Sequence, residues 1–194
     1  AEGVVDSIDD VGRVFHCGRP GTEGYGNAID VLPAPGVSLD LERVTATRRG
    51  TLTTSVCGVC GRQSVDDLVE RCRSMPSGPV VSLDLLLGIM DRLRKSQPTF
   101  AETGGVHAAA IFSAEGELLA CHEDVGRHNA VDKAVGALLY DGLLSPTADL
   151  GGPQPAILCA SGRSSFEIVQ KAVVARIPIV TSVSAASSLA VDLA

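Results

Sequence analysis

The first part of the chain carries short apolar runs that predict strands, followed by two longer runs that predict helices. Three segments combine β-branched residues with flanking glycine or proline, which indicates strands bounded by turns: residues 11–16, 27–32 and 43–47. Ser64 and Asp67 have the spacing of a capping box, which predicts a helix over residues 64–73. A leucine-rich stripe at helical spacing predicts a second helix over residues 82–95.

From residue 99 the pattern changes to that of helices packed on a sheet. Residues 106–113 and 117–122 are joined through Glu115-Gly116 and predict a β-hairpin. Helices and strands then alternate, over residues 128–140 (helix), 156–160 (strand), 164–176 (helix), 178–183 (strand) and a last helix from Ser187. This order predicts an α/β fold with helices on the faces of a sheet.

Ser96, Gln97 and Pro98 predict a break between the two patterns, and we place a domain boundary there. Residues 1–98 are expected to form a smaller, β-rich part with a loop at residues 55–62 and the two helices. Residues 99–194 are expected to form an α/β/α domain. The pattern starts abruptly and stops inside an amphipathic segment, so we expect both ends to be truncated.

Composition narrows the class of protein. The 194 residues are 45% hydrophobic and 20% charged, which is typical of a globular chain. The net charge of −7 and the aromatic content of 3% disfavour a nucleic-acid binder, which needs a basic face and stacking platforms. No apolar run approaches the roughly 20 residues of a membrane helix, and the first residues lack the pattern of a signal peptide. We therefore expect a cytoplasmic protein without a membrane partner.

Two cysteines with glycine neighbours, Cys57 and Cys60, form the first candidate for chemistry. Glycine widens the allowed backbone range, so the segment predicts an accessible loop. Nearby arginines would favour the thiolate. Three chemistries remain open at this point: a structural zinc site, which lacks a second ligand pair here; a thioredoxin-like redox pair; and relay of sulfur as a persulfide, with the second cysteine resolving or assisting.

Two polar segments lie where predicted strands lead into helices. Residues 121–129 gather acids, two imidazoles and a guanidinium, which indicates either an ordinary solvated helix start or a ligand crevice at a sheet edge. Residues 161–165 (SGRSS) precede a helix in which Ser164 and Glu167 are spaced as a capping box. Backbone donors, hydroxyls and one arginine at such a turn indicate either a well-capped helix alone or an anion site. Residues 184–188 repeat the pattern, and two adjacent turns would bind a diphosphate.

Five motifs together resemble those of the FdhD family, the formate dehydrogenase accessory sulfurtransferases. They occur in the family's order over most of the chain, at residues 57–61, 104–110, 123–129, 161–167 and 184–191. The chain departs from the family at its ends, because family members begin with more β structure and continue past residue 194 to another strand and a Gly- and Arg-bearing segment implicated in cofactor binding.

The resemblance implies a cytoplasmic homodimer that takes persulfide sulfur from a cysteine desulfurase. It implies transfer of that sulfur to the molybdenum or tungsten of a bis(molybdopterin guanine dinucleotide) cofactor that formate dehydrogenase receives. Cys57 would carry the sulfur with Cys60 as its partner, no protein ligands would hold a metal, and GDP would mimic part of the cofactor. Expected cofactor-binding residues are His107, Asp124, Arg127, His128, Asn129, Ser161, Gly162, Arg163, Ser164 and Ser165.

Two other functions are compatible with parts of the sequence. The predicted second domain resembles the cytidine-deaminase fold, but no Glu follows His128 by two residues, and residues 162–165 (GRSS) stand where the zinc-binding cysteines belong. We reject a zinc nucleoside deaminase on that ground. A non-catalytic chaperone of the molybdenum cofactor remains the alternative. Alkylation of the thiols separates the two functions, because a pure chaperone keeps its function and a sulfur carrier loses it.

Overall fold

The computed structural model describes residues 4–46, 75, 77–144 and 152–194, except residues 6, 24 and 27. The chain forms two compact units, residues 2–51 and residues 52–194 together with residue 1, and each is described by itself. The predicted loop at residues 55–62 and the predicted helix at residues 64–73 lie outside the described residues. Among the helices in the described ranges, none combines the length and the apolar character that a membrane span requires.

The first unit is built on a two-stranded antiparallel sheet. A short 3-10 helix, η1 (Ile8–Asp10), precedes β1 (Val11–His16), which pairs with β2 (Ile29–Pro33). The two predicted strands in this region are therefore confirmed, although the second begins at residue 29 instead of 27 and ends at residue 33 instead of 32. Gly12 lies so close to β2 that a Cβ there would be 2.6 Å from the carbonyl oxygen of Pro33.

The third predicted strand of this unit, at residues 43–47, is wrong. Most of that segment belongs to the helix α1 (Leu41–Ala46). Its β-branched Val44 and Thr45 favour a strand by propensity, but Asp40 starts a helix before them. The Asp40 Oδ1 accepts the N–H of Glu42 at 2.9 Å, and the Asp40 carbonyl accepts the N–H of Val44 at 2.9 Å. The cap outweighs the propensity of the residues that follow it.

The second unit contains a four-stranded sheet in the order β4-β3-β5-β6. The strands are β3 (His107–Ser113), β4 (Leu118–Asp124), β5 (Pro155–Arg163) and β6 (Ile179–Ser184). β3 is antiparallel to both its neighbours, and β5 is parallel to β6. The predicted hairpin is confirmed as β3 and β4, and the turn between them has Gly116 at a φ of 86°.

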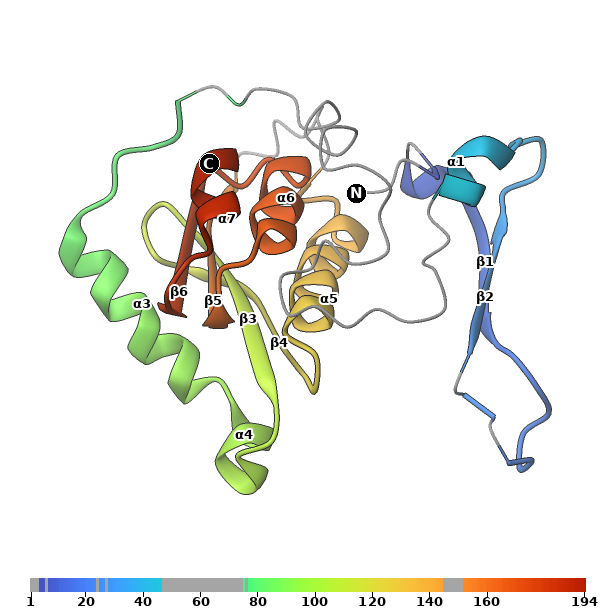
Figure 1. Cartoon of the computed structure of the whole chain (residues 1–194), viewed down its shortest axis with the longest axis horizontal. Helices are drawn as coiled ribbons and strands as arrows, with labels where there is room; N and C mark the ends of the chain where they lie inside the picture. The colour runs from blue at the N-terminus through green and yellow to red at the C-terminus, as the bar shows by residue number, and fades with distance from the viewer. Residues whose placement is uncertain are drawn as a thin grey trace. The chain divides into compact units, whose positions relative to one another are not determined.

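Helices cover both faces of this sheet (Figure 1). On one face lies α3 (Leu83–Lys95), whose Ile89 and Leu93 pack with Ala110, Phe112 and Ile157. On the other lie α5 (Arg127–Tyr140) and α6 (Phe166–Val174), whose apolar residues form the larger core cluster with β3 and β5. The mixed α/β class is confirmed, with helices at the predicted places.

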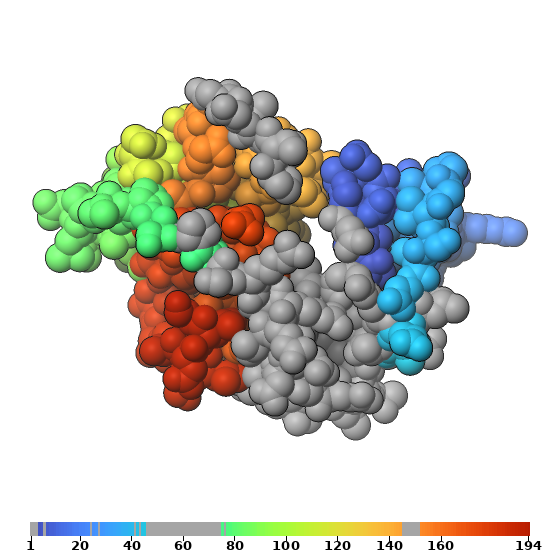
Figure 2. All heavy atoms as spheres, turned by 90° about the horizontal axis from the view of Figure 1, so that it is seen from above, coloured from blue at the N-terminus to red at the C-terminus, as the bar shows by residue number. Residues whose placement is uncertain are grey.

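The expected domain boundary at residue 98 does not coincide with the division between the compact units, which falls between residues 51 and 52. The helix α3 belongs to the second unit because its apolar face packs on the sheet, where Ile89 and Leu93 are almost fully buried. The chain before α3 also lies beside β6 (Figure 2), where a Cβ on Gly78 would be 2.6 Å from that of Pro178. The helix at residues 83–95 is therefore part of the sheet's own core.

Of two further elements, one was not predicted and the other was. The predicted break at Pro98 exists, but Pro98 is also the first residue of a short helix, α4 (Pro98–Thr103), which ends at Gly104 with a φ of 63°. Proline suits the first helical position because that N–H has no partner in the helix. At the C-terminus, the predicted last helix is confirmed as α7 (Ser188–Leu193), and the Ser187 side chain accepts the N–H of Ala190.

Candidate functional site

The candidate site lies at one end of the four-stranded sheet. Because β3 runs antiparallel to β4 and β5, its start meets the ends of both neighbours. His107 pairs in register with Asp124 at the end of β4, and Ala109 pairs with Ala160 shortly before the end of β5. The topology therefore brings together three sequence motifs whose members lie up to 54 residues apart along the chain, as His107 and Ser161 do.

His107, Arg127 and Gly162 meet at the centre of this end. Gly162 has no side chain, and the side chains of Arg127 and His107 lie close to the position that a Cβ would take. A Cβ on Gly162 would lie 3.2 Å from Arg127 Cδ and 3.4 Å from His107 Nδ1. Ser161 lies beside them, with its Oγ accepting the N–H of Ala108 at 2.8 Å and lying 3.5 Å from His107 Nδ1. The hydroxyl proton of Ser161 can thus be offered to the imidazole or to a ligand.

The start of α5 is fixed by Asp124. Its Oδ1 accepts the N–H of Gly126 at 2.8 Å and the side-chain amide of Asn129 at 3.1 Å, and its Oδ2 lies 2.6 Å from Lys133 Nζ. The hydrogen bond from Lys133, helped by the Gly126 N–H, lowers the pKa of Asp124 to about 2. Asp124 is therefore ionised at neutral pH and holds the turn that presents Arg127.

His128 links α5 to the start of α6. Its Nε2 lies 2.8 Å from Ser165 Oγ, and its Nδ1 lies 3.7 Å from Glu167 Oε2. Desolvation by burial lowers the pKa of His128 even though Glu167 acts in the opposite direction. Glu167 itself is buried and pairs with Lys171 at 3.4 Å. His128 is therefore a neutral imidazole whose role is to join the two helices.

The predicted capping box of Ser164 and Glu167 is wrong. The residue that caps α6 is Ser165, and its side chain does not bind the helix backbone but contacts His128. Ser164 and Ser165 are only 6% and 4% exposed, and the Ser165 hydroxyl contacts a protein group. Ser161–Arg163, expected to be a turn, instead completes β5, with an irregular register against β6 between Ala160 and Arg163.

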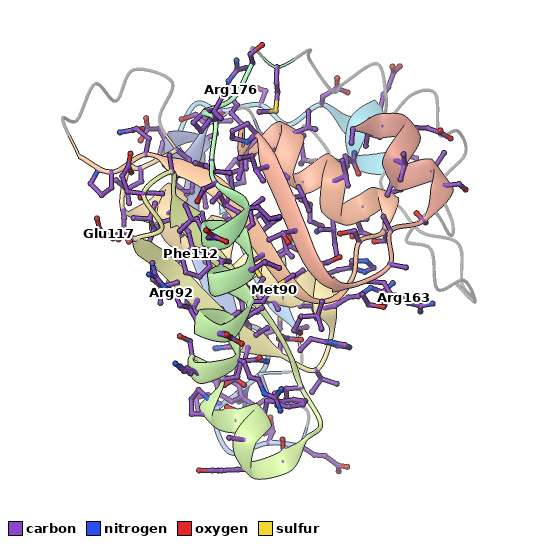
Figure 3. The ribbon with its side chains drawn as sticks, turned by 90° about the vertical axis from the view of Figure 1, so that its left-hand side faces the viewer. Met90, Arg92, Phe112, Glu117, Arg163 and Arg176 are labelled. Atoms are coloured by element: carbon purple, nitrogen blue, oxygen red, sulfur yellow. The ribbon has the colours of Figure 1, made fainter. Side chains whose placement is uncertain are left out.

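The two strand-to-helix turns that were expected to be adjacent do lie together. The N–H of Ser187, before α7, donates to the carbonyl oxygen of Ser164 at 3.0 Å. Arg163 pairs in register with Ser184, and its side chain is exposed and extends away from the end of the strand (Figure 3). Arg163 is therefore the charged group of this turn that is accessible to a ligand.

A pocket of about 530 Å³ adjoins this end of the sheet on the α3 side. His107 and Ser161 line it together with residues that the sequence motifs did not single out, namely Met90, Gln97, Phe100 and Val183. Glu123 fixes the α4 wall, because its carboxylate accepts the N–H groups of Thr99 and Phe100 at 2.9 and 2.8 Å. Burial acts to raise the pKa of Glu123, but these backbone donors outweigh it and the pKa lies below the ordinary value.

Two of the described cysteines, Cys121 and Cys159, do not resemble reactive thiols. Cys159 is buried in the core with its Sγ 3.4 Å from Met90 Sδ, and Figure 3 places Met90 on α3 next to the sheet. Burial raises the pKa of Cys159 to about 12, and it also raises the pKa of Cys121. Both remain protonated at neutral pH. Cys57 and Cys60 lie outside the described residues.

Comparisons with known proteins agree on one family. The FdhD/NarQ family model matches residues 1–194. A protein of Anaeromyxobacter sp. (strain K) named sulfur carrier protein FdhD is 54% identical over 194 residues, which are 100% of this chain and 67% of that protein. A protein of the same name from Mycobacterium tuberculosis is 46% identical over 203 residues, covering 100% of this chain and 69% of that protein.

A solved structure supports the same assignment. A crystal structure from Desulfotalea psychrophila, described as a formate dehydrogenase accessory protein, superposes with a TM-score of 0.53 at 28% identity. The match covers 66% of this chain and 50% of that one, so the chain spans about half of the solved protein and about two thirds of its curated relatives. With the family model matched from residue 1 to residue 194, this chain belongs to the FdhD/NarQ family.

Proposed function

We propose that this chain is a sulfurtransferase that carries persulfide sulfur from a cysteine desulfurase to the bis(molybdopterin guanine dinucleotide) cofactor required by formate dehydrogenase. The observation that carries the proposal is the 54% identity, over the whole chain, with a protein named as a sulfur carrier. The glycine-flanked pair Cys57 and Cys60 supplies the matching chemistry, since sulfur transfer needs an accessible thiolate.

In the loading step, the Cys57 thiolate attacks the terminal sulfur of a persulfide on the desulfurase. A new S–S bond forms on Cys57, the donor's S–S bond breaks, and the donor cysteine leaves as a thiolate. The sulfane sulfur changes carrier without net oxidation or reduction. Cys121 and Cys159 are poor candidates for this step because burial raises the pKa of each thiol.

In the release step, the Cys60 thiolate attacks the inner sulfur of the Cys57 persulfide. The bond to the terminal sulfur breaks, a Cys57–Cys60 disulfide forms, and the terminal sulfur leaves as hydrosulfide. The two electrons that reduce the sulfur come from the two cysteines, so the metal of the bound cofactor receives sulfide. A cellular dithiol reductant then returns the disulfide to two thiols by exchange.

The cofactor is the substrate, and its guanine dinucleotide arms are anionic. Arg127 and Arg163 provide cations at the end of the sheet, and the fork of an arginine suits phosphate oxygens. His107, Ser161 and Asn129 add hydrogen-bonding groups, while Gly162 leaves room between Arg127 and His107. Asp124, His128, Ser164 and Ser165 support this surface from behind through the contacts described above. GDP is the small probe for it.

The proposal includes a cytoplasmic homodimer that meets two proteins, a cysteine desulfurase and formate dehydrogenase. A cofactor with two nucleotide arms gives a physical reason for two-fold symmetry, because each subunit can hold one arm. Engaging both arms raises the effective concentration of the second at its site.

Mass spectrometry tests the loading step. The purified chain is incubated with a cysteine desulfurase and cysteine, digested, and searched for one added sulfur atom on the peptide that contains Cys57 and Cys60. We expect the adduct in the wild-type chain and in Cys121→Ser, and its loss in Cys57→Ser. An adduct on another cysteine with Cys57 bare would contradict the assignment. If no thiol carries sulfur and alkylated protein still supports formate dehydrogenase, the chain is a cofactor chaperone.

A further inference from the structure

Four side chains form a polar ladder between α5 and α6, which lie side by side on one face of the sheet (Figure 1). On α5, His128 and Asp132 are four residues apart and share one face of the helix. On α6, Glu167 and Lys171 have the same spacing. His128 Nδ1 lies 3.7 Å from Glu167 Oε2, and Lys171 Nζ lies 2.6 and 2.7 Å from the two carboxylate oxygens of Asp132. Two polar pairs, one helical turn apart, therefore join the two helices.

The ladder has a buried carboxylate at its centre. The Glu167 side chain is 6% exposed, and that of Lys171, which pairs with it at 3.4 Å, is 13% exposed. A carboxylate withdrawn from water needs such partners, because its desolvation is otherwise costly. Replacing Lys171 would take a cation from a buried carboxylate, and replacing Glu167 would remove the group that links the two pairs. Both side chains are therefore needed to keep the ladder intact.

The ladder ends beside the anion surface, by which we mean the end of the sheet that carries Arg127 and Arg163. Arg127 directly precedes His128 at the start of α5. His128 Nε2 lies 2.8 Å from Ser165 Oγ, and Arg163 stands two residues before Ser165 at the end of β5. The contacts of His128 thus hold the start of α5 against the start of α6. They also hold the two chain positions that carry the arginines.

Members of the ladder act on the His128 ring in opposite directions. Burial has the largest influence on the pKa of His128 and lowers it. Glu167 raises this pKa, Arg127 and Lys171 lower it, and Asp132 raises it. Replacing Glu167 and replacing Lys171 should therefore shift the pKa of His128 in different directions, although each substitution breaks the same ladder.

We propose that Glu167 and Lys171 are positioning residues of the anion surface, which fix the separation of Arg127 and Arg163 and thereby favour a diphosphate over a single phosphate. The inference rests on the proposed function, in which both arginines meet the anionic arms of the cofactor. A diphosphate has two phosphoryl groups, and each can meet one arginine. A single phosphate cannot span two cations that are held apart. Lys171 acts through the ladder, since it is paired with two carboxylates.

Binding of pyrophosphate and of inorganic phosphate to the whole chain, measured by calorimetry at one ionic strength, tests the inference. We expect the wild type to bind pyrophosphate about tenfold more tightly or better, which corresponds to one added charge-assisted contact. In Lys171→Met and in Glu167→Gln, most of this preference should be lost. The two substitutions change the net charge in opposite directions, so a purely electrostatic effect would shift anion binding oppositely in the two variants. That result, a wild type without the preference, or variants that keep it would overturn the inference.

Two further lysine variants are the controls. Lys171→Arg keeps the charge and can donate to both carboxylates, so it is expected to retain the preference for pyrophosphate. Lys95→Met changes the net charge as Lys171→Met does, but Lys95 is exposed in the last turn of α3, and this variant should behave as the wild type. Loss of the preference in Lys95→Met would assign the effect to charge alone and would contradict the role of the ladder.

An NMR titration of His128 separates positioning from a general loosening of the fold. We expect the pKa of His128 to rise in Lys171→Met and to fall in Glu167→Gln. A loosened fold would instead move it toward the ordinary 6.5 in both variants, and that pattern would contradict the inference. If Glu167→Gln does not fold, Asp132→Asn replaces it, because the Asp132 side chain is 57% exposed and its loss also frees Lys171. Loading of sulfur on Cys57 of the wild-type chain is measured separately, so failure of the ladder and failure of the sulfur carrier remain distinguishable.

Discussion

Glu123 and Asp124 are consecutive residues at the end of β4, and their carboxylates hold the starts of two different helices. Glu123 accepts the N–H groups of Thr99 and Phe100 in α4, whereas Asp124 accepts the N–H of Gly126 before α5. Lys133 joins the pair by donating to the Glu123 carbonyl and pairing with Asp124. One strand end thus fixes both the pocket wall and the turn that carries Arg127.

Removing the charge of Asp124 is expected to destabilise the fold at neutral pH. Because its pKa is about 2 in the folded chain, below the ordinary 3.8, its contribution is present above pH 4 and is lost as the pH falls toward 2. We expect Asp124→Asn to lower the free energy of unfolding at pH 7 by about 1 kcal/mol, since Lys133 is half exposed and solvent screens the pair. Urea unfolding at pH 7 and near pH 2 checks this, and a difference that persists undiminished at the lower pH would contradict it.

Arg163 is expected to contribute to the binding of a guanine nucleotide. Replacing it with Ala removes one charge-assisted contact, worth roughly 1.5 to 3 kcal/mol, so GDP affinity should fall by about tenfold to a hundredfold. Arg176→Asn is the control, because Arg176 follows the other end of α6 and asparagine tolerates its φ of 57°. Calorimetry measures both variants. Unchanged affinity in Arg163→Ala would place the nucleotide elsewhere.

His128 is expected to titrate below its ordinary pKa, because burial disfavours the imidazolium. Between the folded pKa and the ordinary value of 6.5, the unfolded chain binds a proton that the folded chain does not. Stability should therefore rise with pH through that window and level off above it. An NMR titration of the His128 ring protons measures the pKa directly, with the urea-unfolded chain as the reference. A midpoint for His128 above 6.5 would contradict the neutral bridge to Ser165.

Cys57 of one chain and Arg163 of the other chain are expected to act together in a homodimer. Mixing Cys57→Ala chains with Arg163→Ala chains should give heterodimers that activate formate dehydrogenase better than the homodimer of either variant. In each heterodimer, the Arg163→Ala chain supplies an intact Cys57 and the Cys57→Ala chain supplies an intact Arg163, so one complete pair remains across the two chains. Light scattering gives the oligomeric state, and the activity of formate dehydrogenase gives the function. Full activity from a monomer would rule out this arrangement.

Local patterns predicted the second unit well because its elements carry their own signals. The hairpin has Gly116 at its turn, and α3 begins at the cap Ser82 and turns an apolar stripe to the sheet. The helix α1 was missed because one hydrogen-bonding residue, Asp40, overrides the β propensity of Val44 and Thr45.

The sequence motifs located only part of the site. They identified the residues that meet at the end of the sheet, because motifs at strand-to-helix junctions gather there in an α/β fold. The pocket was not predicted, since Gln97 stands in what resembled a simple break before Pro98. Only folding brings Gln97 beside Phe100 and His107 around the pocket. In the same way, only packing shows that Ser164 and Ser165 are buried.

The passage of one sulfur atom from Cys57 to the cofactor is the most direct test of the proposed function. The chain is loaded with radiolabelled sulfur by a cysteine desulfurase, freed of cysteine, and mixed with cofactor and inactive formate dehydrogenase. We expect label to leave the Cys57 peptide and to appear on the cofactor as formate dehydrogenase gains activity, with Cys121→Ser behaving as wild type and Cys57→Ser transferring none. Equal transfer of label and equal activation by Cys57→Ser would contradict the account.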